Sequence, residues 1–259
     1  MQNLTIGLFQ FDQAWENPSK NKQELTNALS QSPRADLLLL PEMFSTGFSM
    51  HATSAAESWN ISPTLSWLKA LSDEHQCAIF TSLMIEEEGK YYNRGIFIDQ
   101  GQLIATYDKQ YLFAFAGEDQ VYNAGNQSVV VPFKGWKICL QICFDLRFPE
   151  SARNRAIPDF DYDLLLYVAN WPAKRIAHWD ALLLARAIEN QAYMAAVNRV
   201  GIDNNGHYYN GHSCVVNPDG TYLTPPVDQK EGLIVTQVSS KTLLETRKSL
   251  PFLKERKQK

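Results

Sequence analysis

The sequence predicts an α/β fold with mixed sheets, and three patterns carry this prediction. Short apolar runs typical of strands alternate along the chain with longer segments of helical character. Residues 37–40 are consecutive leucines, as in strands that are covered on both faces. Residues 91–98 and 103–107 are joined by a short turn that contains Gly101, which predicts an antiparallel hairpin. The sheets are therefore not purely parallel.

The other elements follow in chain order. Strands are predicted at residues 4–11, 36–40, 78–84, 94–98, 103–107, 128–131, 137–142, 164–169, 193–200 and 213–216. A polar capping residue followed by proline opens one helix at residues 17–18 and another at residues 62–63. A third helix is predicted over residues 176–191, in which Arg186 and Glu189 are spaced to pair.

Length, charge and cysteine content narrow the class of protein. The 259 residues carry 24 Lys and Arg against 28 Asp and Glu, a net charge of −4 without a basic block, so nucleic acid is not an expected partner. No apolar run approaches the ~18 residues that cross a bilayer, and the first residues have no basic leader. We therefore expect no membrane contact, a cytoplasmic location, reduced cysteines and a small-molecule substrate.

Cys143 is the first candidate for chemistry. It lies where an apolar strand runs into a polar turn, a geometry that places a side chain beside free backbone N–H groups and suits a nucleophile. The alternative is a buried structural cysteine. Cys139 has an even spacing from Cys143 and so shares its strand face, and neither His207 nor His212 has partners at ligand spacing. We predict no metal site.

Three further charged residues are candidates for chemistry. Glu42 comes directly after a buried strand, where the proton affinity of a carboxylate rises as a general base requires; an ion pair or a helix cap is the alternative. Lys109 ends a strand, and the alternative is a lysine that extends to the surface. Glu118 lies on a loop, where simple solvation is the alternative. None of these residues identifies a function alone.

Together and in this order, the motifs resemble the nitrilase superfamily of carbon–nitrogen hydrolases. The resemblance rests on residues 39–42 (Leu-Leu-Pro-Glu), 107–113 (Tyr-Asp-Lys-Gln-Tyr-Leu-Phe) and 142–150 (Ile-Cys-Phe-Asp-Leu-Arg-Phe-Pro-Glu). It implies a four-layer α-β-β-α sandwich, a single carbon-nitrogen hydrolase domain over residues 1–259 and a homodimer. From about residue 247 we expect a C-terminal tail, either exposed or docked through Phe252 and Leu253 on a neighbouring chain.

The resemblance also implies catalytic roles. Cys143 would attack an amide carbonyl, Glu42 would act as the general base, and Glu118 would hold Lys109 in place as a fourth member. Lys109 and the backbone N–H of Phe144 would bind the oxyanion. Phe144 stands where relatives often carry Tyr. Lys109 and the turn N–H groups would lower the pKa of Cys143. No metal and no organic cofactor are required.

The loops at residues 113–118 and 170–175 resemble those of the ω-amidase branch, which hydrolyses the terminal amide of 2-oxoglutaramate or 2-oxosuccinamate. Such substrates carry a carboxylate, which the planar fork of Arg147 or Arg175 would bind; surface or ion-pair roles are the alternative for both. Three aromatic residues are expected to form the walls of a small pocket: Phe48, Phe115 and Trp171. The alternative for each is a position in the apolar core.

Three other functions stay open at this stage. Another hydrolase of the superfamily, such as a nitrilase, an N-carbamoyl amidase or an aliphatic amidase, would differ in its products. A non-catalytic binding protein on the same scaffold would keep its activity without Cys143. A thiol-dependent transferase would pass the acyl group to an amine instead of water.

Overall fold

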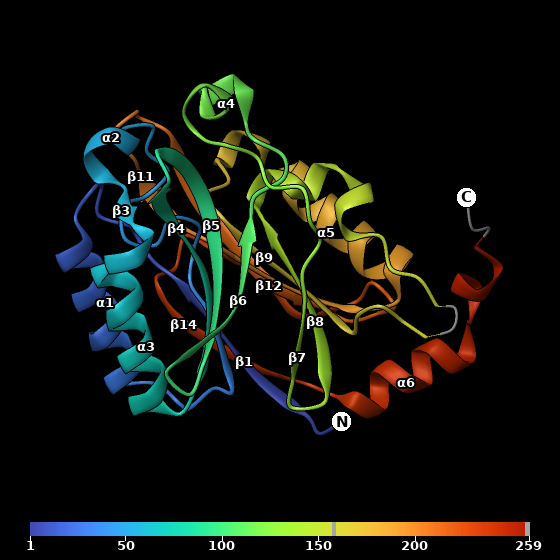
Figure 1. The fold of residues 1–259 in the computed structure, drawn as a ribbon. Helices are drawn as coiled ribbons and strands as arrows, with labels where there is room; N and C mark the ends of the chain where they lie inside the picture. The colour runs from blue at the N-terminus through green and yellow to red at the C-terminus, as the bar shows by residue number, and fades with distance from the viewer. Residues whose placement is uncertain (157–158, 257–259) are drawn as a thin grey trace.

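The protein is an α/β sandwich in four layers, with two mixed sheets inside and helices on both outer faces (Figure 1). The computed structural model describes residues 1–156 and 159–256. The first sheet runs in the order β14-β1-β2-β4-β5-β6, with β3 beside β4, and the second in the order β11-β12-β10-β9-β8-β7, with β13 beside β12. The predicted fold class is confirmed.

The first sheet consists of β1 (Leu4–Gln10), β2 (Leu37–Leu39), β3 (Glu57–Ser58), β4 (Ala78–Glu87), β5 (Lys90–Asp99), β6 (Gln102–Asp108) and β14 (Gly232–Val238). The second sheet consists of β7 (Val130–Phe133), β8 (Trp136–Ile142), β9 (Leu164–Ala169), β10 (Tyr193–Asn198), β11 (Val200–Ile202), β12 (Tyr208–Val216) and β13 (Tyr222–Asp228). The main helices are α1 (Pro18–Ser30), α3 (Pro63–His75), α5 (Ile176–Asn190) and α6 (Ser240–Ser249), and two single-turn helices are α2 (Ala52–Ala55) and α4 (Glu118–Val121).

The leucine run at β2 shows why the sheets lie inside. Leu37 and Leu39 point into the apolar core between the two sheets, while Leu38 and Leu40 point into the core under α1 and α3. Alternate side chains of a strand face opposite sides of the sheet, so a strand that is covered twice must be apolar at every position. Figure 1 shows α1 and α3 on one side of the sandwich and α5 on the other.

Two local predictions from the sequence are confirmed. β5 and β6 form the expected antiparallel hairpin, and Gly101 in its turn has a φ of 71°, a left-handed conformation that glycine adopts without strain. Arg186 Nη1 pairs with Glu189 Oε1 at 2.8 Å on α5. In the described residues, no helix is long and apolar enough to cross a membrane.

The C-terminal third differs most from the sequence prediction. The predicted strand at 193–200 divides into β10 and β11, the strand at 213–216 begins earlier as part of β12, and β13, β14 and α6 were not predicted. β13 carries two prolines and pairs irregularly at a sheet edge, and β14 is only half-buried, so neither has a strong alternating pattern.

The C-terminal segment from about residue 247 is largely exposed, but it is anchored to its own chain. Arg247 forms an ion pair with Asp163 at 2.6 Å, and Leu253 is 2% exposed within its own chain. Leu253 is therefore not available to a neighbouring chain, whereas Phe252 is 38% exposed. The last part of the predicted tail, residues 257–259, lies outside the described residues.

Polar residues that follow several strands lie together at one edge of the sandwich. β2 is parallel to its neighbours in the first sheet, and β8 is parallel to β9 in the second. The hydrogen bond from Asn170, after β9, to Glu42, after β2, shows that the carboxyl ends of these strands meet at one side of the molecule. Glu42 follows β2 and Lys109 follows β6, both in the first sheet, and Cys143 follows β8 in the second. This edge brings three distant parts of the chain together.

Candidate active site

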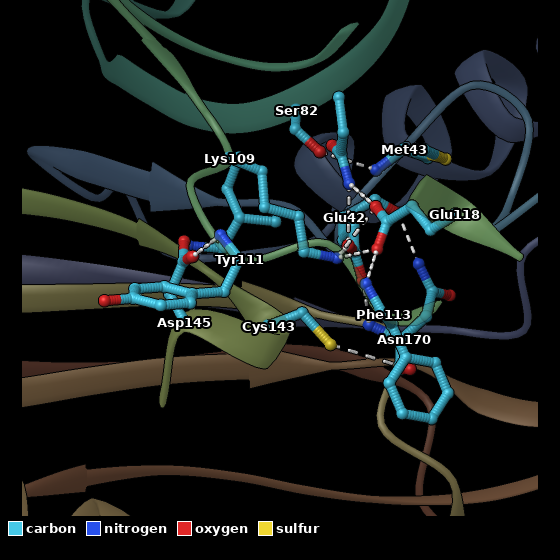
Figure 2. Close-up of polar contacts among 12 residues, drawn as sticks. Glu42, Met43, Ser82, Lys109, Tyr111, Phe113, Glu118, Cys143, Asp145 and Asn170 are labelled. Atoms are coloured by element: carbon cyan, nitrogen blue, oxygen red, sulfur yellow. Dashed lines mark hydrogen bonds and ion pairs between the residues drawn. The ribbon is translucent and has the colours of Figure 1, made fainter. Parts of the chain in front are cut away.

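A buried ionic cluster lies at this edge. Lys109 Nζ is 2.8 Å from Glu42 Oε1 and 2.9 Å from both carboxylate oxygens of Glu118, and all three side chains are fully buried (Figure 2). Burial alone would lower the pKa of Lys109, but the charges of Glu118 and Glu42 raise it well above its usual value. Lys109 is therefore an ammonium ion held by two carboxyl groups.

Two asparagines hold these carboxylates, and the sequence analysis missed both. Asn93 Nδ2 donates to Glu42 Oε1 at 2.8 Å and to Glu118 Oε1 at 3.2 Å. The backbone N–H of Asn170 donates to Glu42 Oε2 at 2.9 Å, and its Nδ2 donates to the Glu42 carbonyl at 2.6 Å. Asn170 follows the apolar run of β9, a signal that could have found it, whereas Asn93 lies inside a strand and gives none.

Glu118 is fixed by the loop that carries it. Its Oε2 accepts the backbone N–H of Phe113 at 2.6 Å. Burial raises the pKa of Glu118, and Lys109 opposes that rise while Glu42 adds to it. A carboxyl group with a raised pKa that contacts a buried ammonium suits proton transfer or the orientation of Lys109.

Cys143 lies in a strained turn beside this cluster. It begins a short 3₁₀ helix (Cys143–Arg147) directly after β8, and its φ of 44° is a conformation that non-glycine residues rarely adopt. Figure 2 shows its Sγ directed toward the carbonyl oxygen of Asn170, 3.9 Å away. Strain of this kind is typical of a nucleophile held at the end of a strand.

The expectation that Lys109 lowers the pKa of Cys143 below its usual value is wrong. Burial raises the pKa of the Cys143 thiol, and the charge of Glu42 raises it further; Lys109 lowers it by less than these together. The two carboxyl groups already offset the ammonium charge. The resting thiol is therefore neutral, and it must lose its proton as it attacks, which requires a base within reach.

A pocket of about 570 Å³ opens over Cys143 and Lys109. Every residue that the sequence analysis assigned to substrate binding or to the oxyanion site lines this pocket: Phe48, Phe115, Phe144, Arg147, Trp171 and Arg175. Trp171 is 2% exposed and forms part of the inner wall, whereas Phe115 is 91% exposed and belongs to the outer rim. Glu42 and Glu118 do not line the pocket; both are fully buried and contact Lys109, which does line it.

The mouth of the pocket is cationic. The Arg147 guanidinium lies 4.7 Å from the Trp171 ring, and the Arg175 guanidinium lies 5.0 Å from the Phe113 ring. In residues 1–156 and 159–256, neither arginine forms an ion pair with a carboxylate. Burial lowers the pKa of Arg147, and the charge of Arg175 lowers it further. Arg147 contacts His178 Nδ1 at 3.3 Å, so what both guanidinium groups lack in the described residues is a carboxylate partner, and two such groups that line one pocket favour an anionic ligand.

The opposite wall is a polar loop that the sequence analysis did not assign to the site. Asp203 accepts backbone N–H groups of Asn205 and His207, each at 2.9 Å, and the Tyr209 hydroxyl at 2.8 Å. All four residues line the pocket. His212 lies elsewhere and pairs with Asp180 at 3.0 Å. Across the part of the chain that the structure describes, no group of His, Cys, Asp and Glu has the arrangement of a metal site.

Comparisons with known proteins agree with this geometry. Residues 5–248 match the family model described as carbon-nitrogen hydrolase. The chain is 40% identical to the Escherichia coli K12 protein named omega-amidase YafV, over 97% of this chain and 96% of that one, and 32% identical to the Bacillus subtilis 2-oxoglutaramate amidase, over 95% of each. A CN-hydrolase superfamily protein of Xanthomonas campestris, solved with an arsenic adduct in its active site, superposes with a TM-score of 0.95 at 36% identity, covering 100% of this chain and 99% of that one.

Proposed function

Because the chain belongs to the carbon–nitrogen hydrolase family, we propose that it is an ω-amidase that acts through Cys143. Its substrate is a 2-oxo dicarboxylic acid monoamide, such as 2-oxoglutaramate or 2-oxosuccinamate, and its products are the 2-oxo acid and ammonia. One observation carries this proposal: a pocket with a cysteine beside a buried lysine–dicarboxylate cluster at its floor, and at its mouth two arginines that have no carboxylate partner among the described residues.

The first half-reaction forms a thioester. Cys143 Sγ attacks the amide carbonyl carbon while Glu42 takes the thiol proton. The carbonyl oxygen becomes an oxyanion, which Lys109 and the backbone N–H of Phe144 stabilise; each such donor contributes about 3 kcal/mol. Glu42 then gives its proton to the amide nitrogen, the C–N bond breaks, and ammonia leaves. The raised pKa of Cys143 supports proton removal during attack rather than a standing thiolate.

The second half-reaction reverses these roles. Glu42 takes a proton from a water molecule, the hydroxyl oxygen attacks the thioester carbon, and the oxyanion is again bound by Lys109. The C–S bond breaks, Cys143 recovers its proton from Glu42, and the 2-oxo acid is released. Glu118 holds Lys109 throughout by accepting from its ammonium through both oxygens. The scheme uses side chains and backbone of this chain alone, without a metal or an organic cofactor.

The substrate carboxylate is assigned to Arg147 and Arg175. Both line the pocket that contains Cys143, and their guanidinium groups already stack on aromatic rings, which limits their motion before the substrate arrives. Phe48 and Trp171 form apolar walls along the short carbon chain, and Phe115 lies at the outer rim. A ligand bound in this way presents its amide to the floor of the pocket.

The test is ammonia release from 2-oxoglutaramate by the wild type and by the Cys143→Ala variant. A panel of glutamine, a nitrile and an N-carbamoyl amino acid covers the other hydrolases of the family, and an added acceptor amine covers acyl transfer. Release from the oxo-amide that is lost in the variant is the expected result. Hydrolysis of a panel member instead would contradict the substrate, and full biological activity of Cys143→Ala would favour a binding protein.

We also propose that the protein is a cytoplasmic homodimer built from one domain. Exposed apolar side chains on α5, on α6 and after α6 support an association surface: Ile188, Leu244, Leu250 and Phe252. All four cysteines are free thiols, as expected in a reducing compartment. Light scattering after size-exclusion chromatography tests the dimer, and a monomeric mass would contradict it.

A further inference from the structure

Asp145 is a fully buried carboxylate that accepts hydrogen bonds from three donors. Its Oδ2 accepts the hydroxyl of Tyr107 at 2.8 Å and the backbone N–H of Ile142 at 3.0 Å. Its Oδ1 accepts the backbone N–H of Tyr111 at 2.9 Å, as Figure 2 shows. Both carboxylate oxygens are therefore used, and together they join the segment at residues 107–111 to the end of β8.

The donors flank the two residues that carry the proposed chemistry. Tyr107 and Tyr111 lie two positions before and two positions after Lys109, and Ile142 directly precedes Cys143. β6 belongs to the first sheet and β8 to the second, so one carboxylate joins the strand ends of both sheets at the active-site edge. No side chain of the ionic cluster is needed for this connection.

A fixed connection matters here because Cys143 has a strained backbone. Its φ of 44° persists only where the surroundings hold the turn in place. The bond from Ile142 to Asp145 closes that turn from within, and the bonds from Tyr107 and Tyr111 set its position relative to Lys109. Attack on a carbonyl requires the thiol and the oxyanion donor at a defined separation.

We propose that Asp145 is a positioning residue that sets the Cys143 thiol relative to the Lys109 ammonium. The inference rests on the roles of Cys143 and Lys109 in the proposed function, and it adds a residue that touches neither substrate nor reacting atoms. Burial raises the pKa of Asp145 to about 6, while the N–H groups of Ile142 and Tyr111, together with Lys109 and Tyr107, oppose a further rise. At neutral pH the group is thus a carboxylate that can accept all three bonds.

The test compares Asp145→Asn with Asp163→Asn. Asp163 is a matched control because it is also buried and also ties strands together, accepting the backbone N–H of Lys137 at 3.0 Å and pairing with Arg247 at the opposite end of β8 and β9. Three quantities are measured for each folded variant: kcat and KM for 2-oxoglutaramate, and the rate at which iodoacetamide alkylates Cys143, followed by mass spectrometry of its peptide. Alkylation displaces iodide and needs no knowledge of the substrate.

The expected result is a kcat about ten- to hundred-fold lower in Asp145→Asn, with KM changed less than about threefold and slower alkylation of Cys143. Asp163→Asn should match the wild type in all three quantities once corrected for the folded fraction. Equal kcat and equal alkylation rates in the two variants would overturn the proposal. If 2-oxoglutaramate is not turned over, the proposed function fails, and the alkylation rates still decide the role of Asp145.

Tyr107→Phe keeps the test decisive if Asp145→Asn does not fold. It removes one of the three donors and leaves the carboxylate and both backbone bonds in place. We expect kcat and the alkylation rate to fall by about tenfold, the lower end of the effect of one hydrogen bond to a charged group. Tyr162→Phe, at another buried tyrosine whose hydroxyl donates to the Ala152 carbonyl, is its control. Identical values in the two tyrosine variants would refute the role of Asp145.

Discussion

The floor and the mouth of the pocket handle charge in opposite ways. At the floor, Lys109 and Glu118 are fully buried, and fixed hydrogen bonds join the ammonium to its carboxyl partners. At the mouth, Arg147 and Arg175 stack on aromatic rings, and neither has a carboxylate partner within residues 1–156 and 159–256. The charges at the floor are therefore paired without a ligand, whereas those at the mouth have no carboxylate partner in the described residues.

This difference orients the substrate. The ammonium at the floor is already paired with two carboxyl groups, whereas the arginines at the mouth have no carboxylate partner in the described residues, so an oxo-amide enters with its amide toward Cys143. Groups at the floor act on charge that develops during reaction and must be rigid. Groups at the mouth bind charge that is already present. Variants at the floor should therefore change kcat, and variants at the mouth should change KM.

The largest effect is expected from Lys109→Met. The change removes the proposed oxyanion donor and leaves Glu42 and Glu118 buried together without a counter-charge. We expect kcat to fall by about 10³-fold or more, and the free energy of unfolding to fall by about 3–5 kcal/mol. Steady-state ammonia release and urea unfolding measure the two effects. The control is Lys174→Met, at an exposed lysine that also lines the pocket, and it should change neither kcat nor the free energy of unfolding. A Lys109→Met enzyme with nearly normal kcat would contradict the distinction between floor and mouth.

Glu118→Gln should have the next largest effect. The amide keeps the shape of the side chain but loses a charge that raises the pKa of Lys109, and one of its two contacts with the ammonium becomes unfavourable. We expect kcat to fall by about 10²-fold with little change in KM, since a donor held less firmly stabilises the oxyanion less well. Asp119→Asn, at the exposed neighbour, is the matched control. A rise in KM at constant kcat would instead place Glu118 in substrate binding.

At the mouth, Arg175→Gln should raise KM for 2-oxoglutaramate and spare kcat. A hydrogen bond to a charged group contributes about 1.5–3 kcal/mol, which corresponds to a rise of about tenfold or more. Arg155→Gln, at an exposed arginine already paired with Asp161, should leave KM unchanged. The comparison becomes sharper with a neutral amide of similar size, whose KM should respond less than that of the oxo-acid. An equal rise in KM for both amides would mean that Arg175 does not bind the substrate carboxylate.

The floor was more predictable from sequence than the bonds that hold it. Glu42 and Cys143 each follow an apolar strand and Lys109 follows the end of another strand, so a polar side chain at these points is visible in the sequence itself. Asn93 lies inside β5, and its partners are 51 and 25 residues away, a relation that only the folded chain creates. Local pattern thus identifies residues at strand ends, and long-range hydrogen bonds need coordinates.

The dependence on long-range contacts also explains which elements and properties the sequence did not predict. β14 pairs with β1 from the opposite end of the chain, with Leu4 opposite Val238, and its half-buried positions give no clear alternation. The net pKa of Cys143 depends on its burial and on how Glu42 and Glu118 offset Lys109, and both require coordinates. The mixed sheets, by contrast, were visible in the Gly101 hairpin and in the doubly covered leucine run.

The smallest effect is expected from Phe115→Ala, and it sets the outer limit of the mouth. Phe115 lines the pocket but is 91% exposed, so its removal costs little buried area, and stability should change by less than about 0.5 kcal/mol. Its ring lies 5.6 Å from that of Phe113, which in turn stacks with Arg175, so a modest rise in KM of about twofold is expected through a looser arginine. Measurement of KM in Phe115→Ala, in Arg175→Gln and in the double variant tests this route. Effects that multiply in the double variant would mean that Phe115 contacts the substrate independently, whereas an unchanged KM relative to Arg175→Gln alone would show that the rim acts only by holding the arginine.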